Sequence, residues 1–277
     1  MTENKLMTRG TRPAKGLIDM ENSHEPDSRR EFLKRLLEGS ATATVLMVFG
    51  PGALAHGPEF RGSEREGEPH HAYAYVIDVN KCIGCGNCVR ACSRENAVPT
   101  DYFRTWVERY VVKGEGVYVD SPKGAIEGFG ELTKRYRENI KLSRTVPKMC
   151  NHCHNPPCIQ VCPVGATFKA PEGFVLVDRD YCMGCGYCVQ ACPYAARFIN
   201  PVEHKSDKCT WCYHRVKKGL LPACVTVCPQ KARLFGDLND VESEVSKVFE
   251  EDKWMVLKPE MHTDPTCFYV GLPREVV

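Results

Sequence analysis

The sequence predicts an α+β protein made of two similar modules of short strands and helices, with a surface insertion between their parts. The stretch C-I-G-C-G-N-C-V-R-A-C at residues 82–92 recurs as C-M-G-C-G-Y-C-V-Q-A-C at residues 182–192. The chain has 17 cysteines among 277 residues, whereas its hydrophobic content of 43% and charged content of 26% are ordinary. Short stretches rich in β-branched and aromatic residues flank the cysteine runs, as expected of strands. The formal charge of +2 gives no indication of a nucleic-acid partner.

The spacing of the cysteines predicts their chemistry. Each repeated stretch has three cysteines separated by two residues and a fourth after three more, which is the bacterial ferredoxin run for a cubane iron–sulfur cluster. The fourth cysteine of such a run ligates a different cluster, so a partner run must exist elsewhere. Two wider runs follow this rule: Cys150-x2-Cys153-x4-Cys158-x3-Cys162 and Cys209-x2-Cys212-x11-Cys224-x3-Cys228. Sixteen cysteines in four complete tetrads predict four [4Fe-4S] clusters and two ferredoxin-like two-cluster modules.

Three other interpretations of the cysteines fit the sequence less well. Pairs of the form C-x2-C also bind zinc, but four thiols within eleven residues are denser than a zinc ribbon provides. An exported protein rich in cysteine is first expected to contain disulfides, unless clusters are inserted before export. A cluster that performs substrate chemistry usually has an iron without a protein ligand, whereas all four tetrads are complete. The sequence therefore favours a non-catalytic electron-transfer subunit over an enzyme or a zinc-stapled scaffold.

The N-terminal region predicts export. Ser28-Arg29-Arg30-Glu31-Phe32-Leu33-Lys34 precedes a moderately apolar segment, and Ala53-Leu54-Ala55 forms an A-x-A cleavage signal. This order resembles a twin-arginine (Tat) signal and predicts a signal peptide at 1–55, a linker at 56–72 and a periplasmic location. The apolar segment is too short and polar to span a membrane, and no other stretch qualifies, so no transmembrane helix is expected in the mature chain.

The remaining elements follow the cysteine runs in order. Strands are expected at 73–79, 104–112, 117–119, 173–177 and 196–199, and helices near 131–140 and 240–250. The ferredoxin-type segments are expected at 73–102, 146–172 and 173–202, and the fourth tetrad at 203–236. An insertion at 103–145 and a tail at 237–277 complete the chain.

The four tetrads together resemble a known family. Their order, the x4 and x11 spacings, Asp207-Lys208-Cys209 and Leu221-Pro222-Ala223-Cys224 are similar to the iron–sulfur subunit of dimethyl-sulfoxide-reductase-type molybdopterin oxidoreductases, over about residues 73–240. With the leader, the chain is most similar to the exported iron–sulfur proteins of tetrathionate reductase and the formate-dependent nitrite reductase system. The resemblance implies crossed ligation and a line of clusters. The implied sets are Cys82, Cys85, Cys88 with Cys228; Cys209, Cys212, Cys224 with Cys92; Cys150, Cys153, Cys158 with Cys192; and Cys182, Cys185, Cys188 with Cys162.

The function implied by the resemblance is an electron relay in anaerobic respiration. Single electrons would pass between a quinol-oxidising integral membrane subunit, or a cytochrome, and a separate catalytic molybdopterin subunit. The alternative is an electron-transfer subunit of a membrane-bound hydrogenase, or of another respiratory complex without molybdopterin.

Several residues near the cysteines invite functional interpretations. His152, His154 and His214 are expected to pack or hydrogen-bond rather than ligate, because the tetrads are complete. Trp211 either shields a cluster or packs ordinarily, and Cys267 is expected to be a free thiol. Six basic residues form a basic neighbourhood near the cysteines: Lys148, Lys205, Lys208, Arg215, Lys217 and Lys218. They either raise the reduction potentials of the clusters, bind an acidic partner or form a solvated surface.

Overall fold

The computed structural model describes residues 71–132, 134–250 and 254–276. All of them belong to the second of two units into which the chain divides, residues 61–277. The expected signal peptide and the expected linker up to residue 70 lie outside the described residues. None of the helices in the described residues has the length and apolar character needed to cross a bilayer.

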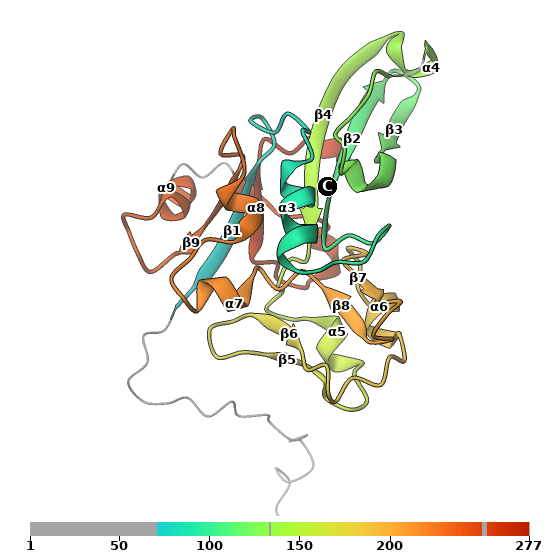
Figure 1. The fold of residues 1–277 in the computed structure, drawn as a ribbon. Coiled ribbons are helices and arrows are strands. Elements are labelled where there is room, and N and C mark those ends of the chain that lie inside the picture. Colours follow the sequence, from blue (N-terminus) through green and yellow to red (C-terminus); the bar gives the residue numbers. More distant parts are fainter. Residues whose placement is uncertain (1–70, 133, 251–253, 277) are drawn as a thin grey trace, which may run out of the picture. The chain divides into compact units, whose positions relative to one another are not determined.

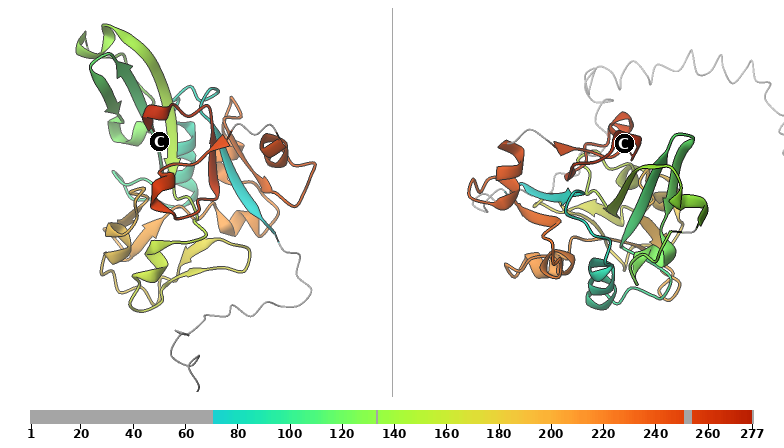
Figure 2. Two further views of the ribbon diagram at one scale, coloured as in Figure 1. Left: turned by 180° about the vertical axis from the view of Figure 1, so that it is seen from behind. Right: turned by 90° about the horizontal axis from the view of Figure 1, so that it is seen from above.

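The central sheet has the strand order β10-β11-β1-β9 (Figure 1). Strand β1 (Tyr73–Asp78) pairs antiparallel with β9 (Arg233–Asp237) and parallel with β11 (Cys267–Val270), which pairs with β10 (Trp254–Met255). The view from behind in Figure 2 shows β11 beside β1. The strand expected at 73–79 is confirmed, whereas the strands of the tail, β10 and β11, were not expected to join this sheet.

The two faces of β1 pack against different neighbours. Ala74 and Val76 contact Val245 of helix α9 (Glu244–Glu250), which lies within the helix expected at 240–250. Tyr75 and Ile77 belong instead to the main core, which contains many of the cysteines. Because successive side chains of a strand point to opposite faces, one strand joins the helical cover to the cysteine-rich interior.

Short helices carry many of the cysteines. Helix α3 (Asn87–Glu95) contacts α8 (Ala223–Thr226), and α5 (Pro157–Gln160) contacts α6 (Tyr187–Gln190). Helix α7 (Tyr213–Val216) follows the start of the fourth run.

Two small hairpins separate the later cysteine runs. Strand β5 (Thr167–Lys169) pairs with β6 (Val175–Val177), and β7 (Arg197–Ile199) pairs with β8 (Ser206–Lys208). The strands expected at 173–177 and 196–199 are confirmed within two residues. The two helix pairs, the two hairpins and the cysteines agree with a mixed α+β chain that contains two dicluster modules.

The expected insertion forms a three-stranded sheet with the order β3-β2-β4. It contains β2 (Thr105–Lys113), β3 (Gly116–Asp120), β4 (Ile140–Met149), η1 (Pro122–Ala125) and the short helix α4 (Lys134–Arg137). The strands expected at 104–112 and 117–119 are confirmed. Strand β4 was not expected, because its outer half is mostly exposed and has only two apolar residues, Ile140 and Leu142.

The β3-β2-β4 sheet has an inner and an outer end. Val107 and Val146 are 1% and 0% exposed and pack in the main core, whereas the outer part projects away in Figure 1. Strand β4 runs across the expected boundary between residues 145 and 146. The sheet therefore belongs partly to the core and partly to the surface.

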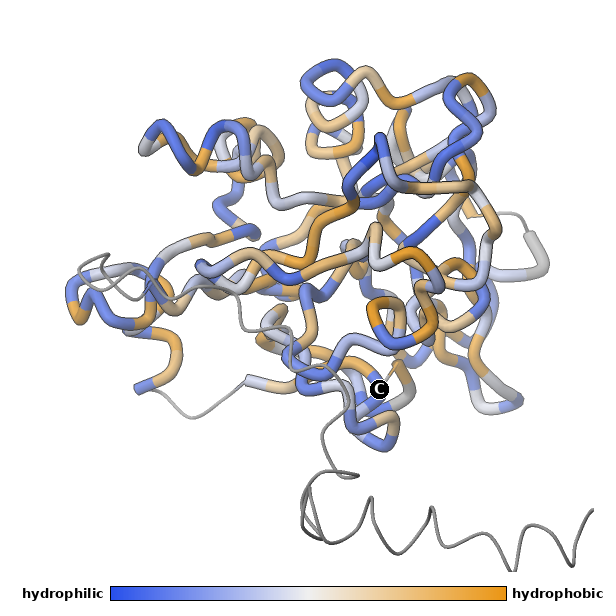
Figure 3. The backbone as a smooth tube through the Cα atoms, turned by 90° about the horizontal axis from the view of Figure 1, so that it is seen from below, coloured by the Kyte–Doolittle hydropathy of each residue, from blue (hydrophilic) through white to orange (hydrophobic). Residues whose placement is uncertain are grey.

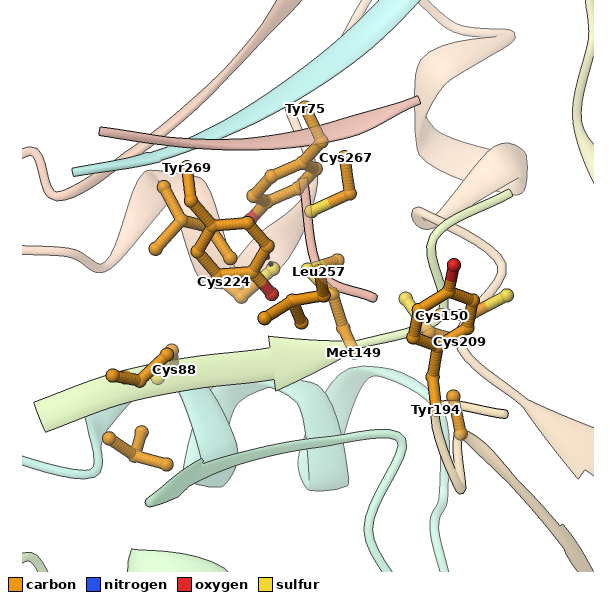
Figure 4. Packing of buried hydrophobic residues seen from close by; sticks show 14 of the residues in the cluster. Tyr75, Cys88, Met149, Cys150, Tyr194, Cys209, Cys224, Leu257, Cys267 and Tyr269 are labelled. Atoms are coloured by element: carbon orange, nitrogen blue, oxygen red, sulfur yellow. Dashed lines mark hydrogen bonds between the residues drawn. The ribbon is translucent and has the colours of Figure 1, made fainter. Parts of the chain in front are cut away.

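The core contains several of the cysteines. Figure 4 shows Cys88, Cys150, Cys209 and Cys224 in the same packed region as aromatic side chains. Figure 3 shows short apolar stretches interrupted by polar ones. The C-terminal tail completes the described part of the fold with η2 (Pro259–Met261), β11 and η3 (Arg274–Val276).

Candidate functional site

Glycines shape the two repeated cysteine loops. Gly84, Gly86, Gly184 and Gly186 have φ angles of 68°, 76°, 73° and 79°, in the left-handed region that glycine adopts without a steric penalty. Gly86 and Gly186 come directly before helices α3 and α6. The loops therefore curl tightly and bring three cysteines to one concave surface each.

The first loop forms one wall of a small cavity. Cys82, Cys85 and Cys88 line it together with Cys228, which comes from the far end of the fourth run. We name these four cysteines site I. Cys228 Sγ also accepts a hydrogen bond from the Ala232 backbone N–H at 3.2 Å.

Two further cavities join the second and third runs. Site III is a small cavity lined by Cys150, Cys153, Cys158 and Cys192. Site IV is a small cavity lined by Cys162, Cys182, Cys185 and Cys188. Each run therefore supplies three cysteines to one cavity and its fourth cysteine to the other.

The remaining four cysteines of the four runs form site II: Cys92, Cys209, Cys212 and Cys224. All four are buried, with exposures between 4% and 5%. The Asn96 side-chain amide lies 3.6 Å from Cys92 Sγ and 3.8 Å from Cys212 Sγ, so it joins the first run to the fourth. Burial raises the pKa of Cys92, and the nearby Cys224 and Cys212 raise it further.

The donor set fits an iron–sulfur cluster better than a single ion. All seventeen cysteines lie in the described residues and are free. Burial raises the pKa of Cys153 to about 12, and a bound metal centre would favour its thiolate form. Among the described residues, no three His, Cys, Asp or Glu side chains are arranged to hold a metal ion. The sulfurs instead surround cavities, as a cubane requires.

Backbone donors also face the sulfurs. Trp211 N–H donates to Cys209 Sγ at 3.4 Å, and Ser206 N–H donates to Cys182 Sγ at 3.4 Å. Such hydrogen bonds stabilise the thiolate form and are one of the factors that set cluster reduction potentials.

Direct contacts connect neighbouring sites. Tyr75 Oη lies 3.1 Å from Cys224 Sγ of site II and within 3.5 Å of Arg233, which lines site I. Trp211, from the site II loop, donates its Nε1–H to the Cys150 carbonyl of site III at 3.1 Å. The sites therefore follow one another in the order I, II and III.

Sites III and IV share a second set of contacts. Arg197 lines site III and donates from Nη2 to Cys158 Sγ at 3.1 Å. Its Nη1 lies 3.4 Å from Ser206 Oγ, which lines site IV and lies 3.2 Å from Cys188 Sγ. Site IV therefore follows site III.

The histidines expected to pack or hydrogen-bond do so. His152 is 1% exposed, and its Nδ1 accepts from the Val175 backbone N–H at 3.1 Å while Nε2 donates to the Cys209 carbonyl at 3.0 Å. It stacks on Trp211 with ring centroids 4.2 Å apart. His154 contacts Lys169 Nζ at 3.0 Å, and His214 lies 2.9 Å from Glu95.

The basic neighbourhood does not form one surface. Lys208 is buried at 1% exposure, and Lys205 donates to the Cys182 carbonyl at 2.6 Å. Lys148 and Arg215 pair with glutamates at 3.2 Å and 3.1 Å, while Lys217 and Lys218 are exposed. Cys267 is fully buried in β11, and burial raises its pKa to about 12, so it is an unreactive core residue.

Two buried arginines that line sites I and III, Arg233 and Arg197, were not predicted from the sequence. A signal existed. Each arginine ends a C-P-x-x-A-R sequence that begins at the last cysteine of a run, at Cys228 and at Cys192.

Comparisons with known proteins support iron–sulfur clusters as the groups that these cysteines bind. Two models described as a 4Fe-4S dicluster domain match residues 81–166 and 143–238. The chain is 45% identical to a tetrathionate reductase subunit of Salmonella typhimurium over 247 residues, 88% of each chain. It is 45% identical to the corresponding tetrathionate reductase subunit of Archaeoglobus fulgidus, over 72% of this chain and 82% of that one. It is 35% identical to the NrfC homolog of Haemophilus influenzae, over 89% of this chain and 98% of that one. This protein therefore belongs to the family of iron–sulfur electron-transfer subunits of the dimethyl-sulfoxide-reductase-type molybdopterin oxidoreductases.

Proposed function

We propose that sites I to IV each hold one [4Fe-4S] cluster and that the chain relays single electrons along them in that order. The observation that carries this proposal is the crossed gathering of sixteen cysteines into four contiguous sites. Each cluster, when bound, supplies a one-electron carrier. The protein supplies thiolates, N–H donors and a dry surrounding.

Exposure supports the two ends of the line as the points of electron entry and exit. Ile83 and Met183, in the loops of sites I and IV, are 61% and 62% exposed. Trp211 and His152, in the loops of sites II and III, are 2% and 1% exposed. Partner proteins can therefore approach the end sites closely, whereas the middle sites are covered by the protein itself.

We propose one partner protein at each end of this line of sites. One end would face a catalytic molybdopterin subunit, and the other a quinol-oxidising membrane subunit or a cytochrome. Relatives include proteins named as components of polysulfide reductase and of selenate reductase. Because different reductases contain this type of protein, the catalytic partner would determine the terminal substrate.

The proposed division of the chain follows the cysteine runs. Residues 73–102 and 203–236 would form one two-cluster module, and 146–172 with 173–202 the other. Residues 103–145 would be an insertion whose outer part lies on the surface, followed by a tail at 237–277. The leader at 1–55 would direct Tat export of the folded, cluster-loaded chain to the periplasm.

Two experiments test the proposal. The purified chain should contain about 16 iron and about 16 sulfide atoms, and redox titration followed by EPR should resolve four one-electron couples. Zinc in place of iron, or reduction of an oxyanion acceptor by the isolated chain, would contradict it. For export, the double change Arg29→Lys and Arg30→Lys should retain the protein in the cytoplasm, and periplasmic delivery of this variant would count against a Tat leader.

A further inference from the structure

Two buried arginines lack the partner that a buried charge requires. Arg233 is 2% exposed and Arg197 is 4% exposed. Among the described residues, neither forms an ion pair with a carboxylate, whereas the buried Arg104 pairs with Asp207 at 2.8 Å. An uncompensated buried charge is strongly destabilising, so these two guanidinium groups need another source of negative charge.

Arg233 lies between sites I and II. It lines site I, and its Nη1 lies 3.5 Å from Tyr75 Oη, which in turn lies 3.1 Å from Cys224 Sγ of site II. Its Nη2 donates to Thr105 Oγ1 at 2.9 Å, which fixes the guanidinium.

Arg197 occupies the corresponding place between sites III and IV. It donates to Cys158 Sγ of site III at 3.1 Å and to Thr167 Oγ1 at 3.2 Å, and Thr167 lines site IV. Its Nε–H is buried and has no acceptor in the described part of the chain, so a donor remains for a ligand. Both arginines thus pair with a threonine and face cysteine sulfur.

The sequence shows that the two positions are equivalent. Arg233 and Arg197 each lie five residues after the cysteine that closes a site, in C-P-Q-K-A-R and C-P-Y-A-A-R. The third C-P-x-x-A sequence ends in Thr167, the residue that binds Arg197. Each module therefore has one such arginine, placed between its two sites.

We propose that Arg233 and Arg197 are fixed counter-charges between adjacent clusters, each raising the reduction potentials of the two clusters beside it. The proposal rests on the four-cluster assignment above. A cubane with four thiolates is anionic, and its negative charge grows on reduction, so a cation close by favours the reduced form. Arginine keeps its charge when buried, so the effect does not depend on pH.

The arrangement also explains how neighbouring clusters can both be reduced. Two anionic groups close together in a low-dielectric interior repel each other strongly. A cation between them offsets part of this repulsion for both members of the pair. Lys208, 1% exposed beside Cys209, lies at the remaining junction between sites II and III and donates Nζ to the Cys209 carbonyl at 2.8 Å.

The test is an EPR-monitored redox titration of the full, cluster-loaded chain. Arg233→Gln should make reduction of two clusters about tenfold less favourable, or about 59 mV lower for one electron. Arg197→Gln should shift the other two clusters and leave the first pair unchanged. Lys231→Gln is the control, because its side chain is 76% exposed and water screens its charge, so it should shift none.

Conservative variants distinguish charge from packing. Arg233→Lys should retain full iron with potentials nearer to wild type than those of Arg233→Gln. A Gln variant with full iron and unchanged potentials, or one that shifts all four clusters alike, would overturn the proposal. If Arg233→Gln loses iron, the result for Arg233→Lys decides between charge and packing. Iron loss or lowered potentials in Arg233→Lys as well would mean that the arginine acts through packing. Wild-type protein with fewer than four clusters would instead count against the proposed function.

Discussion

The two copies of the cysteine loop have the same sequence pattern but should respond oppositely to glycine-to-alanine changes. In the site IV loop, a Cβ added at Gly184 would lie 2.1 Å from the His204 carbonyl oxygen, whereas one at Gly186 meets nothing within 4 Å. Carbon and carbonyl oxygen normally approach to about 3.3 Å, so Gly184→Ala must displace the His204 backbone by about 1.2 Å. That loop also carries Lys205, which holds the Cys182 carbonyl.

Both alanines must also adopt the left-handed conformation, at φ angles of 73° and 79°. This conformation alone costs about 1–2 kcal/mol. Gly186→Ala should therefore destabilise the loop by about that amount and keep its cluster. Gly184→Ala adds a backbone clash, so we expect it to open site IV and lose about a quarter of the iron.

The order reverses in the site I loop. A Cβ at Gly86 would lie 2.3 Å from the Ala125 carbonyl oxygen, a backbone atom, whereas one at Gly84 meets the Phe129 ring at 2.8 Å. A side-chain ring can move more cheaply than backbone. Gly86→Ala should therefore be the damaging change in this loop and Gly84→Ala the milder one.

The assay is iron content together with the rate at which visible cluster absorbance is lost in denaturant, measured on all four variants. Equal damage by both alanines of one loop would refute the reasoning. The same rank order in the two loops would also refute it, because it would mean that the repeated sequence rather than its surroundings decides.

Three further predictions concern stability. Asp207→Asn leaves Arg104 buried without its carboxylate partner, since the Asp207 and Arg104 side chains are 4% and 7% exposed. The change should lower the free energy of unfolding by about 3–5 kcal/mol, which would be seen as much faster cluster loss in urea. An unchanged rate would contradict the buried ion pair. Removal of iron by a chelator should abolish the cooperative thermal transition and the near-UV circular dichroism, because many core residues are cysteines; a folded apo-protein would contradict the dependence of the core on clusters. Cys267→Ala should keep full iron and cost only about 1 kcal/mol, and loss of a cluster would instead make Cys267 a ligand.

Much of the site could be predicted because cluster chemistry fixes cysteine spacing. The strands before the first and third runs were predictable for the same reason, since β-branched residues lead directly into C-x2-C-x2-C. Strand β4 could not be predicted, because pairing with β2 rather than its own composition makes it a strand. The parallel pairing of β11 with β1 joins residues far apart in the chain and leaves no local signal.

The buried arginines were missed for a different reason. A charged residue is predicted to lie on the surface unless its partner is known. Arg197 and Arg233 line cysteine sites that form only after distant runs have come together, and in our proposal the clusters at these sites supply the missing negative charge. The C-P-x-x-A-R repeat was the one local indication.

The most direct test of the crossed arrangement is the EPR spectrum of Cys92→Ser compared with those of two reference variants. Cys92 lies in the first run, but the structure groups it with Cys224 at site II rather than with Cys88 at site I. We predict that Cys92→Ser alters the same cluster signal as Cys224→Ser and leaves the signal altered by Cys88→Ser intact. A Cys92→Ser spectrum that matches Cys88→Ser instead would contradict the crossed ligation and the order of the four sites.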